Sequence, residues 1–189
     1  MPPLPPREER TLQAVGARRK VSGVPPRSEF IRLLRQVGAQ GEGLVAVFDA
    51  RSIVGERHLY SAWAHLGRAR ARGESRLRDR AAELALFVAG DDQLPRALKK
   101  VGVADDSDEF VLVAERPRDL AGLLEQFGLA LAPEVYPRIP TAASLERLGI
   151  TAEERAAVPE SAWEGLVLER VALLELEAGR VGPTSTAKP

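Results

Sequence analysis

The sequence of 189 residues contains no cysteine. A chain without cysteine has no disulfide framework, no thiolate nucleophile and no zinc site of the cysteine type. Long apolar runs are also missing, because the longest, Leu84 to Ala89, is far shorter than the roughly 20 residues that cross a bilayer. The N-terminus lacks the apolar segment of a signal peptide. We therefore expect a cytoplasmic protein without a membrane-spanning segment.

Histidine is scarce, and the sequence holds only His58 and His65. Seven residues along a helix separate them by about 10 Å, which is too far for one metal ion, whose helical ligands stand three or four residues apart. No phosphate-cradling glycine motif, serine elbow or histidine-glutamate metal motif occurs. We therefore predict a protein that is not an enzyme, with no metal and no cofactor, and two histidines that form hydrogen bonds beside the core. The alternative of a small metabolic enzyme would need a deep polar cleft with one of these histidines beside a carboxylate.

Charge is balanced overall but unevenly spread. Six arginines fall between Arg68 and Arg80, against Glu74 and Asp79, whereas ten glutamates and five arginines fall between Glu125 and Arg180. A local basic patch determines the potential that a phosphate group meets within a Debye length of about 8 Å. Two interpretations stay open at this point: a nucleic-acid surface, or an ordinary solvated face.

Short apolar runs alternate with amphipathic segments, which is typical of an α+β fold. Strands are predicted near residues 11–21, 44–48 and 110–114, with a short edge strand within 129–139. Helices are predicted over residues 29–37, 56–70, 81–90, 93–101, 118–127, 141–148, 151–158 and 161–177. We expect one domain over residues 11–178, a small antiparallel sheet with a layer of helices on one side. The ends, residues 1–10 and 179–189, are expected to be disordered.

The helix at residues 81–90 is apolar on all sides except at Glu83, so we expect it to be buried. A buried carboxylate needs a partner, and Arg80 and Arg76 precede it by three and seven residues on the same side. We predict that an arginine binds Glu83 in a structural role.

The last predicted helix has two apolar faces. The broad face contains Trp163, Leu166, Val167, Val171, Leu173 and Leu174. A second stripe on the opposite side contains Leu168, Ala172 and Leu176. A surface helix needs one apolar face, so the second stripe meets another part of the fold or another protein.

Several segments together resemble the archaeal form of the small kinase-binding subunit of the KEOPS complex. They are DARSIVGERHLYSAW, the helix with Glu83, VAGDDQLPRALKKVGV, FVLVAE and LERVALLEL, and the similarity extends over Thr11 to Glu177. The KEOPS complex makes threonylcarbamoyladenosine in transfer RNAs that read codons beginning with A. The resemblance implies a non-catalytic subunit that binds the atypical kinase/ATPase of the complex directly, contacts other KEOPS subunits indirectly, and recruits transfer RNA by its 3′ CCA end.

The resemblance also implies two sets of contacts. The predicted RNA-binding residues are Arg70, Arg72, Arg76, Arg78, His58 and Gln93. The predicted kinase-binding residues are Leu168, Ala172, Leu176 and Glu169. The sequence departs from the family pattern at Leu77 and Asp79. Both lie in the arginine-rich segment between Arg68 and Arg80, called the arginine loop below. The alternative is a purely protein-binding regulator of a kinase without RNA contact.

Overall fold

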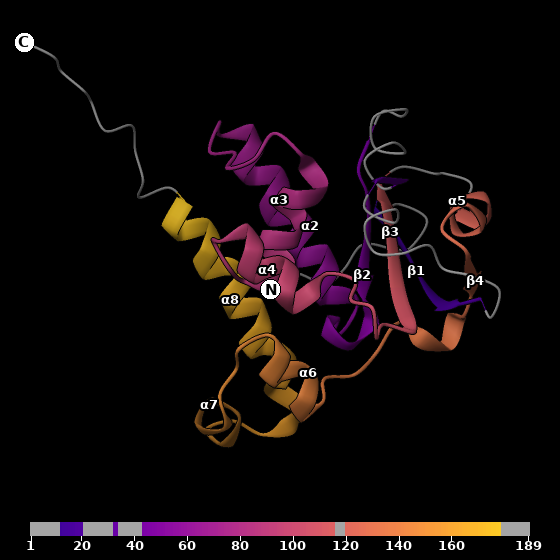
Figure 1. The fold of residues 1–189 in the computed structure, drawn as a ribbon. Coiled ribbons are helices and arrows are strands. Elements are labelled where there is room, and N and C mark those ends of the chain that lie inside the picture. The colour runs from indigo at the N-terminus through magenta and orange to yellow at the C-terminus, as the bar shows by residue number, and fades with distance from the viewer. Residues whose placement is uncertain (1–11, 21–31, 34–42, 116–119, 179–189) are drawn as a thin grey trace, which may run out of the picture.

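A computed structural model of the chain describes residues 12–20, 32–33, 43–115 and 120–178, which form an antiparallel sheet between two layers of helices (Figure 1). The strands are β1 (Leu12–Arg19), β2 (Val45–Asp49), β3 (Glu109–Glu115) and β4 (Leu129–Leu131). The helices are α2 (Glu56–Ala71), α3 (Arg80–Ala89), α4 (Leu94–Val101), α5 (Leu120–Gln126), α6 (Ala142–Arg147), α7 (Ala152–Ala156) and α8 (Trp163–Ala178). Short 3₁₀ turns stand at Ala50–Ser52, Pro133–Val135 and Glu160–Ala162. The predicted α+β class is confirmed.

The strand order is β2-β3-β1-β4, and every neighbouring pair is antiparallel. The apolar run of β3 lies in the centre, where Leu112 is opposite Val15 of β1 on one side and Val47 of β2 on the other. Because side chains alternate along a strand, β3 supplies both faces of the sheet. Val111 and Val113 belong to one core cluster, and their neighbours along the strand belong to the other.

The larger core cluster lies between the sheet and the helices α2, α3, α4 and α8. The smaller cluster lies on the opposite face, where α5 covers the sheet with Leu123 and Leu124, and Phe127 follows directly (Figure 1). The prediction that all helices lie on one side was therefore wrong for α5. Its apolar face has the same pattern as the others, and nothing in that pattern specifies a side of the sheet.

Helix α3 is the buried centre of the larger cluster, as its composition predicts. Every residue from Glu83 to Ala89 is buried. Asp79 caps its start by accepting hydrogen bonds from the N–H groups of Ala81 and Ala82, and Gly90 ends it in the left-handed conformation with φ 57°. Helix α8 packs across α2 and α3 at this end of the fold (Figure 1).

No helix in the described ranges is long and apolar enough to cross a membrane. Of the helix predicted over residues 29–37, the structure describes only residues 32–33, and both are helical. The predicted disordered ends, residues 1–10 and 179–189, also lie outside the described residues.

Candidate interaction surfaces

The buried carboxylate of Glu83 organises the loop before α3. Its side chain is fully buried and accepts three hydrogen bonds, from Arg70 Nη1 at 2.5 Å, from the Ser75 hydroxyl at 2.9 Å and from the backbone N–H of Arg76 at 2.6 Å. The prediction that an arginine binds Glu83 is confirmed, but the side chain is that of Arg70 in α2. Arg80 instead forms an ion pair with Glu115 at 2.7 Å.

A second carboxylate, Glu175 near the end of α8, is surrounded by cationic and hydrogen-bonding groups of α2 and of Arg72, which follows it. Arg68 Nη2 lies 3.1 Å and Arg72 Nη2 lies 2.5 Å from its oxygens, and Nδ1 of His65 is hydrogen-bonded to Oε2. Burial opposes ionisation of Glu175, but the hydrogen bonds from the two arginines and from His65 outweigh it and lower the pKa to about 2. Burial also lowers the pKa of His65, against the effect of its bond to Glu175. Glu175 therefore binds α8 to α2 as a carboxylate.

The arginine loop carries less free charge than its sequence suggests. Arg70 is neutralised by Glu83, and Arg72 binds both Glu74, at 2.8 Å, and Glu175. The Nη2 of Arg76 donates to a backbone carbonyl, that of Leu174, at 3.1 Å, which leaves its charge without a carboxylate partner among the described residues. Arg78 is exposed and has no ion-pair partner in the described part of the chain.

Of the predicted RNA-binding arginines, Arg76 and Arg78 therefore keep their charge available. Arg70 holds Glu83, so its guanidinium is committed to a fully buried carboxylate, and its predicted RNA contact stays a prediction. Arg72 is about half exposed but shares its charge between two glutamates.

The predicted RNA contact through His58 is contradicted, because the ring is fully enclosed. The backbone N–H of Val54 donates to Nδ1 at 3.4 Å, so Nε2 carries the proton and donates to the carbonyl of Val88 at 2.9 Å. Burial lowers the pKa of His58 to about 4, and the bond to Val88 only partly offsets this. His58 is therefore a neutral core residue that links α2 to α3, as the residue pattern predicts.

Gln93 is exposed at the start of α4, where it stands in the N-cap position. It lies in a turn that Asp91 shapes by accepting a hydrogen bond from the N–H of Gln93 at 3.0 Å. Its predicted RNA contact stays a prediction.

The outer face of α8 is apolar and partly open to solvent. Leu176 is 66% exposed and Leu173 is 45% exposed, whereas Leu168 and Ala172 are half-buried along the same side of the helix. Glu169 is exposed between them and has no ion-pair partner among the described residues. The second stripe thus faces outward at its C-terminal end. Leu173 was wrongly assigned to the inner face, since it extends this exposed patch.

A groove of about 480 Å³ lies between α4, α7 and α8, and leucines of α8 form part of its lining. Its cations are already paired: Arg96 and Lys100 each lie 3.0 Å from Asp91, and Arg170 lies 2.6 Å from Glu154. Neither histidine lines this groove. His65 does lie beside a carboxylate, Glu175, which two arginines also bind, but this pair lies outside the groove.

Within the described ranges, no group of three or more histidine and acidic side chains could hold a metal ion. The residues that sequence reasoning missed are Glu175, Arg68 and Leu173. The signal for Glu175 was an isolated acid between Leu174 and Leu176, the same pattern that marks Glu83 in α3.

The sequence matches no protein-family model, and a comparison with curated proteins finds no significant similarity. The function proposed below depends on the geometry of these surfaces and on the sequence resemblance.

Proposed function

We propose that this chain is a non-catalytic, cytoplasmic subunit of the KEOPS type, which binds the atypical kinase/ATPase of that complex and recruits transfer RNA. The observation that carries the proposal is the exposed apolar patch on α8, where Leu176 and Leu173 are 66% and 45% exposed. Other KEOPS subunits are contacted indirectly, through the kinase.

The patch has the properties of a helix that docks into a groove of a partner. Two leucines one turn apart present their side chains to solvent, and half-buried Leu168 and Ala172 extend the patch along the helix. The inner side of α8 is anchored independently, through buried Val167, Val171 and Leu174. A partner can therefore cover the outer side without any change in the core.

Leu176→Glu and Leu173→Glu test this docking. Each change places a charge where a partner would remove water, and we expect binding to the co-expressed kinase to weaken by about 30-fold or more, the effect of a central hot-spot residue. The matched control is Leu131→Glu, because Leu131 is 60% exposed on the edge strand β4, away from α8. Kinase binding is measured by co-purification and by isothermal titration. Full binding by both α8 variants would exclude this face.

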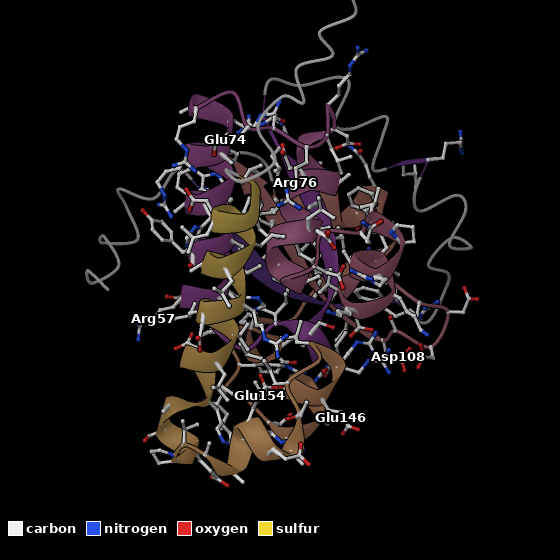
Figure 2. All side chains as sticks on the ribbon, turned by 90° about the vertical axis from the view of Figure 1, so that its left-hand side faces the viewer. Arg57, Glu74, Arg76, Asp108, Glu146 and Glu154 are labelled. Atoms are coloured by element: carbon white, nitrogen blue, oxygen red, sulfur yellow. The ribbon has the colours of Figure 1, made fainter. Side chains whose placement is uncertain are left out.

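RNA recruitment is supported by the two arginines whose charges meet no carboxylate among the described residues, Arg76 and Arg78. They belong to the loop before α3, and Figure 2 places Arg76 beside the last turns of α8, near Glu74. Guanidinium groups bind the phosphates of a single-stranded RNA end without reading sequence. Exposed Gln93 provides a polar side chain for a further contact.

The salt dependence of transfer-RNA binding distinguishes this proposal from the alternative of a purely protein-binding regulator. Binding of transfer RNA through phosphates releases counterions, so its affinity falls steeply as salt rises. We expect Arg78→Glu to weaken transfer-RNA binding and to reduce this slope by about one. The control is Arg57→Glu at the opposite end of α2 (Figure 2), which makes the same change in net charge. A chain that binds the kinase but shows no retention of transfer RNA in a gel shift would favour the alternative.

A further inference from the structure

Three arginines of the arginine loop converge on the last turns of α8. Arg68 and Arg72 bind the carboxylate of Glu175, and Arg76 donates to the neighbouring carbonyl of Leu174. Glu175 itself is only 9% exposed. The chain therefore has one buried oxyanion at the point where its arginine side chains meet.

The guanidinium groups around Glu175 are of a kind that also binds phosphate. Forked guanidinium groups recognise carboxylates and phosphates by the same charge-assisted hydrogen bonds. The side chains of Arg68 and Arg72 are 50% and 45% exposed, so both guanidinium groups are open to an external ligand while the carboxylate lies behind them. A phosphate group and the carboxylate of Glu175 would therefore compete for the same two guanidinium groups.

The local charge is cancelled in this arrangement. Arg68 and Arg72 carry two positive charges, and Glu74 and Glu175 carry two negative ones. A phosphodiester that approaches Arg68 or Arg72 must compete with Glu175, whereas one that approaches Arg78 meets no such competitor in the described part of the chain.

We propose that an RNA phosphate binds the solvent-facing sides of Arg68 and Arg72, beside Arg76, and that it competes with the carboxylate of Glu175 for these two arginines. The inference rests on the proposed function for its ligand. It assigns Arg68 to the RNA-binding surface and makes Glu175 an internal competitor that limits RNA affinity.

The test uses the full chain and a short fluorescein-labelled single-stranded RNA that ends in CCA, titrated by fluorescence anisotropy over a range of salt. Glu175→Gln keeps the shape of the side chain but removes its charge, so Arg68 loses its carboxylate partner and Arg72 keeps only Glu74. We expect the variant to bind the RNA about tenfold more tightly at low salt, the loss of one charge-assisted competitor. The salt slope should become steeper by about 0.7 for each additional phosphate that the arginines neutralise.

Glu146→Gln is the matched control, because Glu146 is an exposed carboxylate on α6 at the far end of the molecule from Arg76 (Figure 2). It changes the net charge equally and is expected to leave RNA affinity within about twofold of the unmodified chain. Glu175→Asp provides a milder variant that keeps the charge but withdraws it by one methylene, and it should show an intermediate gain. Circular dichroism checks that α8 stays folded.

Three results would overturn the inference. Equal tightening by Glu146→Gln would show a general charge effect, and unchanged or weaker binding by folded Glu175→Gln and Glu175→Asp would show that Glu175 only anchors α8. In both cases, strong RNA binding by the unmodified chain would leave the proposed function standing. If neither the unmodified chain nor Glu175→Gln binds RNA even at low salt, the inference and RNA recruitment fall together.

Discussion

Because His58 is buried and neutral, we expect the free energy of unfolding to depend on pH in a specific way. The folded chain keeps the ring neutral with a pKa of about 4, whereas the unfolded chain titrates near 6.5. Between these two values the unfolded state binds more protons, so the free energy of unfolding falls as the pH is lowered. Protonation would also turn Nδ1 into a donor that faces the N–H of Val54.

The magnitude follows from the two pKa values. For a single group with these values, lowering the pH from about 7.5 to about 5 removes about 2 kcal/mol of stability, and the slope approaches about 1.4 kcal/mol per pH unit. The pKa of His65 is also lowered, so it adds a loss of the same sign. Carboxylates with lowered pKa values, such as Glu175 at about 2, lose their contribution only at more acidic pH.

Urea denaturation followed by circular dichroism, at a series of pH values between about 5 and about 7.5, measures this effect. The variant His58→Gln keeps a donor for the carbonyl of Val88 but does not titrate, so its pH profile should be flatter by about 2 kcal/mol. The difference between the two profiles removes the contribution of every other group, including Glu164, whose pKa burial raises. Parallel profiles would refute a buried, neutral His58.

Three further predictions concern stability. Glu83→Ala is expected to lower the free energy of unfolding by about 3 kcal/mol, because the guanidinium of Arg70 and a backbone N–H lose a buried partner, and urea denaturation of a variant within about 1 kcal/mol of the unmodified chain would contradict this. Gly90→Ala should cost about 1 to 2 kcal/mol, since Gly90 has φ 57° and an added Cβ would lie 2.9 Å from Cβ of Arg170. Gly67→Ala should instead add about 0.5 to 1 kcal/mol, because Gly67 is in mid-helix with no atom within 4 Å of an added Cβ, and a melting temperature that moves the same way in both glycine variants would contradict the reasoning.

Local signals were sufficient for most of the secondary structure. The short apolar runs predicted as strands at 44–48 and 110–114 correspond to β2 and β3, and the helix predicted over residues 151–158 is α7, which a capping box at Thr151 and Glu154 starts. The helix predicted over residues 81–90 is α3, which ends at Gly90. These features depend on neighbouring residues along the chain, so the sequence alone contains the necessary information.

The candidate site was harder to predict because its charges pair over long distances. Glu175 lies 107 residues after Arg68, and Glu115 lies 35 residues after Arg80. Each sequence segment shows an excess of one charge, and only folding brings the opposite charge to it. The segment between Arg68 and Arg80 is indeed rich in arginine. A prediction from the sequence nevertheless overestimates how much of its positive charge is free, because distant glutamates pair with several of these arginines.

The sequence by itself indicated which segments form helices and strands, that α3 is buried, and that α8 has more apolar surface than one face requires. The tertiary structure decided that α5 lies on the far face of the sheet, that His58 is enclosed, and that Glu83 and Glu175 neutralise arginines of α2. The physical reason is the range of the interactions: capping and apolar periodicity act within a few residues, whereas burial and ion pairing depend on which distant segments come within a few ångströms of each other.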